Sequence, residues 1–165
     1  MLGSRGSIVP TFINQIKMNK NITITDPAMT RFNITMTQAL DLIFRALEKG
    51  IGGEIFVPKL KAYKVGDMKN AIIELLNVKT KTKIIDVRPG EKYHEVLINK
   101  DEIRNSYENK EDYVLIDKKM IVPSTKKNQY TKNTKFTDEY SSDKVELMSV
   151  EEIKNILIKE NLMPL

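Results

Sequence analysis

The sequence predicts an α/β fold, because segments with helical spacing of apolar residues alternate with short β-branched runs along the chain. Two further observations support a folded globular protein. Hydrophobic residues make up 41% and charged residues 30% of the 165 positions, a balance that allows a core and differs from that of disordered chains. The length suits one domain, and no internal repeat is visible.

Two helices are predicted in the first third of the chain. The first has Ser7 as its expected N-cap and Pro10 in its first turn, where the missing N–H costs nothing. The second opens with Thr35 and Gln38 in capping-box spacing and ends at Gly50. The apolar residues that recur on one face of these helices are Val9, Phe12, Ile13, Ile16, Ala39, Leu40, Ile43, Phe44 and Leu47.

Three more helices are predicted further along. One follows Asp67, one contains Val96 and Leu97, and the last starts at a capping box formed by Ser149 and Glu152. The inner-face residues of the first and last of these are Met68, Ala71, Ile72, Leu75, Leu76, Ile153, Ile156 and Leu157.

Short apolar runs bounded by turn residues predict the strands. The expected strands are residues 22–25, 54–57, 83–87, 113–116 and 120–122, with the last two as a hairpin. We therefore divide the chain into an α/β portion (1–122), a polar arm or loop (123–148), and a C-terminal helix with its tail (149–165).

The composition excludes several classes of function. The chain has no Cys and a single His, His94, so thiol catalysis, disulfides and histidine-rich metal sites are not expected. Residues 1–90 carry a balance of +7 and residues 91–165 a balance of −2, so the basic half suits an anionic ligand. A dense basic stripe with interleaved aromatics is missing, so we expect no nucleic-acid partner. No apolar run is long enough for a membrane span and no signal peptide opens the chain, so we expect a cytoplasmic protein without a membrane partner.

Three polar segments could carry function: residues 3–7, 25–32 and 88–92. The first combines two glycines, two hydroxyls and an Arg before a helix N-terminus, chemistry that suits a phosphate, although a flexible N-terminus explains it equally well. The second places Arg31 beside a strand end, where a solvated surface arginine is the simpler interpretation. In the third, Arg88 precedes a Pro-Gly turn, and its guanidinium could hold a diphosphate by two parallel hydrogen bonds.

Taken in order, these segments resemble the C-terminal half of the inverting UDP-N-acetylglucosamine 4,6-dehydratases, polysaccharide-biosynthesis enzymes of the extended short-chain dehydrogenase/reductase superfamily. The resemblance runs through GSRGSIVPTF, ITITDPAMTRF, GGEIFVPK, VRPGEKYHEVLI and EYSSD, nearly the whole chain. It implies the substrate-binding part of an NAD(P)-binding Rossmann-like α/β fold, without the N-terminal nucleotide-binding half. Sugar-nucleotide 4-epimerases of capsule synthesis share much of this pattern and remain the alternative.

The resemblance also implies ligand contacts at the matching positions. The residues implied to touch NADP are Met1, Leu2, Gly3, Ser4 and Arg5. The residues implied to touch the UDP-sugar are Ile8, Thr25, Arg31, Arg88 and Glu91, with Arg88 on the diphosphate and Glu91 on a hydroxyl. Arg31 could instead pair with an acidic residue of the fold.

The chain departs from the family in its cofactor and catalytic motifs. None of its seven glycines builds G-x-G-x-x-G, and the superfamily's Tyr-x-x-x-Lys helix is expected upstream of residue 1. The one pair with that spacing, Tyr140 and Lys144, lies in the polar arm and is expected to be structural. We therefore expect no catalytic residue or metal ligand, no activity of the chain alone, and a missing N-terminal Rossmann half as partner, with a homo-oligomer possible. A non-catalytic nucleotide-sugar-binding module and an inert remnant remain alternatives.

Overall fold

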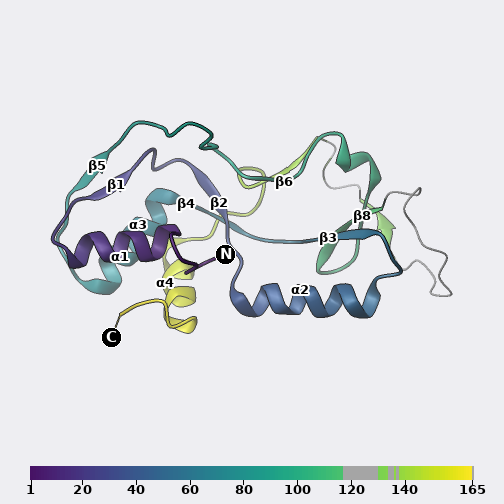
Figure 1. Ribbon diagram of the computed structural model, residues 1–165, viewed down its shortest axis with the longest axis horizontal. Coiled ribbons are helices and arrows are strands. Elements are labelled where there is room, and N and C mark those ends of the chain that lie inside the picture. Colours follow the sequence, from purple (N-terminus) through teal and green to yellow (C-terminus); the bar gives the residue numbers. More distant parts are fainter. Residues whose placement is uncertain (117–129, 134–135, 137, 165) are drawn as a thin grey trace.

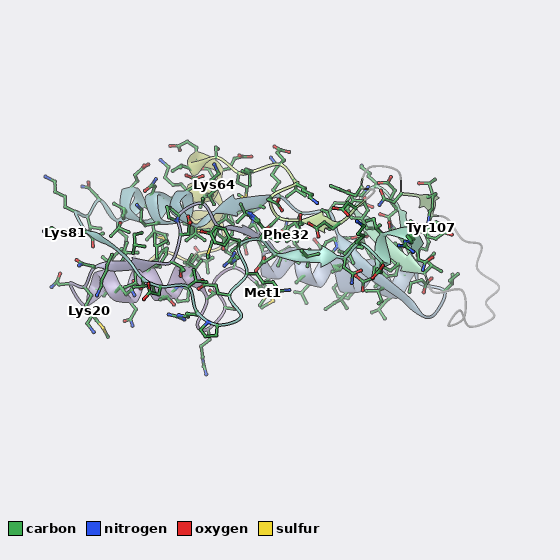
Figure 2. All side chains as sticks on the ribbon, turned by 90° about the horizontal axis from the view of Figure 1, so that it is seen from above. Met1, Lys20, Phe32, Lys64, Lys81 and Tyr107 are labelled. Atoms are coloured by element: carbon green, nitrogen blue, oxygen red, sulfur yellow. The ribbon has the colours of Figure 1, made fainter. Side chains whose placement is uncertain are left out.

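The computed structural model describes residues 1–116, 130–133, 136 and 138–164. It confirms the α/β class: helices and short strands alternate, and the chain forms an elongated molecule with two lobes (Figure 1). Figure 2 shows Lys20 and Lys81 at one end and Tyr107 toward the other, with Met1 and Phe32 between them.

The first lobe combines three helices and a pair of parallel strands. These are α1 (Ile8–Lys17), β1 (Ile22–Ile24), α3 (Val65–Leu76), β5 (Thr82–Ile84) and α4 (Val150–Lys159). The helices form because each carries apolar residues at helical spacing, and those residues bury against one another. The buried core of this lobe consists of Val9, Phe12, Ile13, Ile22, Ile24, Met29, Tyr63, Val65, Met68, Ala71, Ile72, Met148, Ile153 and Leu157.

Two short antiparallel strands connect the lobes. β2 (Thr30–Phe32) pairs with β4 (Ala62–Lys64), and Arg31 lies opposite Tyr63 in this register. Neither strand was predicted from the sequence, because three-residue strands give too little alternation to identify.

The second lobe is built on a four-stranded antiparallel sheet. The strand order is β3 (Glu54–Pro58), β8 (Asp112–Ile116), β7 (Ser106–Glu108) and β9 (Thr131–Lys132). A short 3-10 helix, η1 (Glu102–Asn105), precedes β7. The buried core of this lobe consists of Val57, Ile98, Ile103, Tyr113, Leu115 and Tyr140.

Helix α2 (Met36–Lys49) lies below β3 in Figure 1 and leaves its apolar face uncovered. The predicted capping box is confirmed, with Thr35 Oγ1 accepting from the Gln38 N–H and the Gln38 side chain accepting from the Thr35 N–H. No residue of α2 is buried. The exposed apolar side chains are Leu40, Ile43, Phe44 and Leu47, between 47% and 73% accessible. Helix α2 therefore has the apolar spacing of a helix that packs against a neighbour, but no described residue covers its apolar face.

The prediction of a helix containing Val96 and Leu97 is wrong. Residues Val96–Ile98 form β6, which pairs antiparallel with β10 (Tyr140–Ser141). Two of the three residues are β-branched, and Ile98 is fully buried in the second core, so packing and pairing favour a strand. The segment is also too short for a stable helix of its own.

Several local details differ from the predictions. Strand β5 ends at Ile84 instead of residue 87, because its partner β1 offers only three residues. Helix α3 begins at Val65, and Asp67 lies in its first turn instead of before it. Ser7 occupies the N-cap position of α1, but its hydroxyl makes no capping bond.

The later elements follow the prediction more closely. The capping box of Ser149 and Glu152 starts α4 as expected. The strand predicted at 113–116 is β8, whereas its predicted hairpin partner at 120–122 lies outside the described residues. In the polar stretch 123–148, residues 131–132 and 140–141 form strands on the second lobe.

Candidate functional site

A cavity of about 360 Å³ lies at the N-terminus of α1, beside the ends of β1 and β2. The segment 85–95, which follows β5, closes its other side. The residues predicted to bind ligand that line this cavity are Met1, Leu2, Ile8, Thr25, Arg31, Arg88 and Glu91. The structure therefore brings seven of the ten predicted positions, from three separate parts of the chain, to one hollow.

The other three predicted positions lie outside the cavity lining. Gly3 has a positive φ of 74°, a conformation that favours glycine, and a Cβ there would displace the end of the Leu162 side chain. The Ser4 hydroxyl donates to the Met1 carbonyl at 2.8 Å. Arg5 is exposed.

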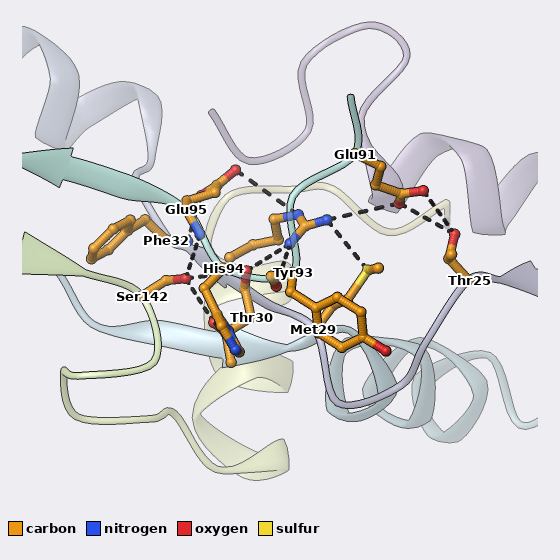
Figure 3. A network of polar contacts seen from close by, with 10 residues as sticks. Thr25, Met29, Thr30, Phe32, Glu91, Tyr93, His94, Glu95 and Ser142 are labelled. Atoms are coloured by element: carbon orange, nitrogen blue, oxygen red, sulfur yellow. Dashed lines mark hydrogen bonds and ion pairs between the residues drawn. The ribbon is translucent and has the colours of Figure 1, made fainter. Parts of the chain in front are cut away.

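Arg31 is fixed from several sides by residues that Figure 3 labels, among them Thr30, Glu91 and Glu95. Its Nη1 donates to the carbonyls of Thr30 at 2.8 Å and Tyr93 at 3.1 Å. Its guanidinium also forms ion pairs with Glu91 at 3.8 Å and with Glu95 at 4.0 Å. The pairing with acidic residues of the fold, considered above as an alternative, is thus present in the structure.

Glu91 connects two segments of the cavity wall, the one that contains Thr25 and the turn at Arg88. Its carboxylate accepts from the Thr25 hydroxyl at 3.1 and 3.2 Å and from the Arg88 backbone N–H at 3.1 Å. The Glu91 N–H in turn donates to the Arg88 carbonyl at 2.9 Å, which closes the turn around Pro89 and Gly90. Segment 88–91 is therefore held against the end of β1 by side-chain contacts, since no strand extends to it.

Arg88 differs from Arg31 in having no acidic partner. Its side chain is exposed and its guanidinium forms no hydrogen bond or ion pair with any described residue. Three carboxylates line the cavity, those of Asp26, Glu91 and Glu95, and the second and third of these are in contact with Arg31. An anionic ligand would therefore find its available cation at Arg88.

A buried polar cluster anchors the segment that carries these residues. Thr30 Oγ1 lies 2.8 Å from His94 Nδ1 and 2.6 Å from Ser142 Oγ. Ser142 also accepts from the Glu95 N–H at 2.9 Å, and its own N–H donates to the Glu95 carbonyl at 2.8 Å. Glu95 in turn accepts from the Phe32 N–H at 2.8 Å. His94 is therefore a packing residue of a loop.

Asp26, which lines the cavity, is held by Tyr93 from outside the lining. The Tyr93 hydroxyl donates to the Asp26 carboxylate, and the Ala28 N–H donates to the same side chain at 2.7 Å. These bonds hold the pKa of Asp26 below its usual value and, on the other side, raise the pKa of Tyr93. Asp26 therefore stays ionised and Tyr93 stays protonated near neutral pH.

Tyr140 and Lys144 have structural roles, as predicted. The Tyr140 hydroxyl accepts from the Leu60 N–H at 2.7 Å, and its ring is buried in the second core. Lys144 pairs with Asp138 and Glu139. The hydroxyl and the ammonium group thus serve separate parts of the fold.

Glu95 and Tyr63 also line the cavity, and neither was predicted from the sequence as a site residue. Both residues lie in stretches whose local sequence indicates only a helix or a loop and gives no sign of a ligand site. Within the described residues, no cluster of His, Asp and Glu could hold a metal ion. Across those same residues, no helix has the length and hydropathy to cross a membrane.

Comparison with known proteins identifies the family. Residues 1–117 match the family described as "Polysaccharide biosynthesis protein". The chain belongs to this family. Its fold and its relatives are those of the extended short-chain dehydrogenase/reductase superfamily.

Several relatives of this family member are similar over almost all of its length. It is 32% identical over 159 residues to the UDP-glucose 4-epimerase of Rickettsia rickettsii (strain Sheila Smith), covering 96% of this chain and 47% of that protein. It is 33% identical over 163 residues to the UDP-glucose 4-epimerase of Rickettsia canadensis (strain McKiel), covering 98% and 48%. The X-ray structure of Pen from Bacillus thuringiensis superposes with a TM-score of 0.83 at 32% identity, covering 99% of this chain and 48% of that one. The chain thus spans about half the length of the relatives it matches.

These relationships imply a nicotinamide cofactor for the whole enzyme of this family. The described residues do not form a dinucleotide site: Met1 and Leu2 line the cavity, but no glycine-rich turn joins a strand to a helix beside them.

Proposed function

We propose that the protein is the substrate-binding part of a nucleotide-sugar-modifying enzyme of surface polysaccharide biosynthesis. The observation that supports this proposal most strongly is the uncompensated guanidinium of Arg88 at a cavity lined by Glu91 and Thr25. The positive group suits a diphosphate, and the carboxylates suit the hydroxyl groups of a ribose or a sugar.

Each side chain would then have a separate role. Arg88 binds the diphosphate by charge-assisted hydrogen bonds. Glu91 accepts a hydrogen bond from a ligand hydroxyl, in place of the one it now accepts from Thr25. Arg31, already bonded to two carbonyls and two carboxylates, positions Glu91 and Glu95.

Two reactions fit this substrate class. The resemblance of the motifs favours a C5-inverting UDP-N-acetylglucosamine 4,6-dehydratase that uses NADP. The names of the relatives, UDP-glucose 4-epimerases, support the epimerase alternative equally well. Both reactions require a UDP-sugar, so the proposal for this cavity is the same in either case.

The exposed face of α2 suggests a partner for this chain. Four large apolar side chains on one helix face exceed what a soluble monomer usually exposes in one place. Because the relatives are about twice as long, we propose that the polypeptide forming the rest of the family's fold covers this face. In the chain alone, where that polypeptide is not bound, we expect copies to self-associate through the same face.

Calorimetric titration with UDP-N-acetylglucosamine, UDP-glucose and UDP tests the proposed function. We expect the 165-residue chain to bind all three and, when NADP is added, to convert neither sugar nucleotide. Loss of water from UDP-N-acetylglucosamine, or exchange of the C4 configuration by NMR, would show that the chain is active alone and contradict that part of the proposal. If none of the three ligands binds, the cavity is not a nucleotide-sugar site.

A further inference from the structure

Tyr63 is a buried residue in the wall of this cavity, and no sequence motif singles it out. It lies on β4 opposite Arg31 on the neighbouring strand β2. Only 6% of the residue is accessible, and the side chain lines the cavity. The ring packs in the first core, together with Met29 and Val65. The position of the side chain is therefore set by two strands and a packed core.

The hydroxyl of Tyr63 has no protein partner among the described residues. The buried Tyr140, by contrast, bonds through its hydroxyl to the backbone of Leu60. The described side-chain atoms that are both fully buried and unpartnered belong to Ser7, Asn33 and Asn109, so the Tyr63 hydroxyl keeps some access to the outside. Since the residue is otherwise enclosed and lines the cavity, that access is through the cavity. A polar group in such a position normally finds a hydrogen-bond partner.

The surroundings of Tyr63 determine which hydrogen bond its hydroxyl can make to a ligand. Burial is the main cause that raises the pKa of its phenol, and the charge of Glu95 adds to it, so the group remains a neutral O–H donor near neutral pH. The nearby cation, Arg31, is already paired with Glu91 and Glu95. This part of the wall therefore suits a neutral ligand group better than a phosphate, whereas Arg88 suits the phosphate. A ligand hydroxyl could accept from Tyr63 and donate to one of the carboxylates.

We propose that Tyr63 is a further ligand-binding residue of the cavity, and that its hydroxyl donates a hydrogen bond to a hydroxyl oxygen of the bound nucleotide sugar. The inference rests on the proposed nucleotide-sugar function. Two parts of such a ligand carry hydroxyl groups, the ribose and the sugar, and both have the required chemistry.

The substitution Tyr63→Phe tests this proposal, because it removes one oxygen and keeps the ring. The matched control is Tyr107→Phe on β7, a partly exposed tyrosine of the second lobe that does not line the cavity. Both variants and the unmodified chain are titrated with UDP-N-acetylglucosamine, UDP and 2′-deoxy-UDP, and their thermal unfolding is measured.

We expect Tyr63→Phe to weaken UDP-N-acetylglucosamine binding by about 2- to 13-fold, the range of one neutral hydrogen bond, and Tyr107→Phe to leave it unchanged. Loss for both UDP and UDP-N-acetylglucosamine, but not for 2′-deoxy-UDP, would identify the ribose 2′-hydroxyl, and an equal loss for all three ligands would identify the ribose 3′-hydroxyl. Loss for UDP-N-acetylglucosamine alone would identify the sugar. The melting temperature should not fall, because no described protein bond is removed.

Other results would overturn the inference. Equal affinities of Tyr63→Phe and the unmodified chain for all three ligands would remove Tyr63 from the binding site while leaving the proposed function intact. A lower melting temperature with unchanged affinities would assign the hydroxyl to the fold. If the unmodified chain binds none of the ligands, the proposed function fails and the role of Tyr63 fails with it.

Discussion

Replacing Arg88 is the most direct perturbation of the proposed diphosphate contact. Arg31 is committed to two carbonyls and two carboxylates, whereas the Arg88 guanidinium has no described partner. A hydrogen bond to a charged group contributes about 1.5–3 kcal/mol. Because Arg88 is exposed, solvent screening favours the lower end, so Arg88→Ala should weaken UDP binding about 10-fold. Arg88→Lys should recover only part of the UDP affinity, since an ammonium group cannot form the two parallel hydrogen bonds of a planar guanidinium.

The comparison of UDP with uridine locates the effect. Calorimetric titration of Arg88→Ala should show a much larger loss for UDP than for uridine, with the free energy of unfolding changed by less than about 0.5 kcal/mol. The matched control is Arg104→Ala on η1, an exposed arginine of the second lobe. If the two ligands lose affinity equally, Arg88 does not bind the phosphates. If UDP affinity changes less than twofold, Arg88 is only a solvated turn residue.

Three further predictions concern the rest of the molecule. Arg45→Met should lower the free energy of unfolding by about 3–5 kcal/mol in urea denaturation, because the fully buried Asp112 carboxylate loses its two bonds at 2.8 and 2.6 Å; adding Asp112→Leu should restore much of that loss. Phe44→Glu should reduce self-association in analytical ultracentrifugation without lowering the melting temperature, and unchanged association would place the contact elsewhere. The Ser149 backbone N–H is the main cause that lowers the pKa of Glu152 to about 2, so this carboxylate stabilises the fold above about pH 4.5 and loses that effect as the pH falls toward 2. The stability difference between the natural chain and Glu152→Gln should therefore shrink over that pH range, and a difference that stays constant would contradict the pKa.

The sequence was most informative where the chemistry is local. The capping boxes at Thr35 and Ser149 each need only residues three positions apart, and both form as predicted. The strands β2 and β6 were missed because each has three residues and pairs with a strand more than 25 positions away. Their identity depends on a partner that no local window contains, so the Val96–Ile98 run was interpreted as part of a helix.

In the candidate site, too, the sequence predicts best the residues whose contacts are local. Arg88 and Glu91 could be predicted as a pair because one turn holds them together. Tyr63 could not, because its place in the cavity follows from the register of β4 against β2, and a tyrosine in a short polar stretch carries no signal by itself. The apolar face predicted for α2 is present, but none of its residues is buried within the described chain, because spacing shows where apolar residues gather and not what covers them.

The polar cluster around Thr30 gives a physical reason why motifs distant in sequence occur together. Ser142, from the Tyr-Ser-Ser-Asp segment, contacts Thr30 across 112 positions and also bonds to the backbone of Glu95. These bonds fix the strand that carries Arg31 to the segment that carries Arg88 and Glu91. No residue of segment 139–143 lines the cavity, yet the segment holds two of its walls in place by bonding to Glu95 and Thr30. The motifs that indicated a ligand site are therefore of two kinds, those whose side chains face the ligand and those that hold the facing residues in register.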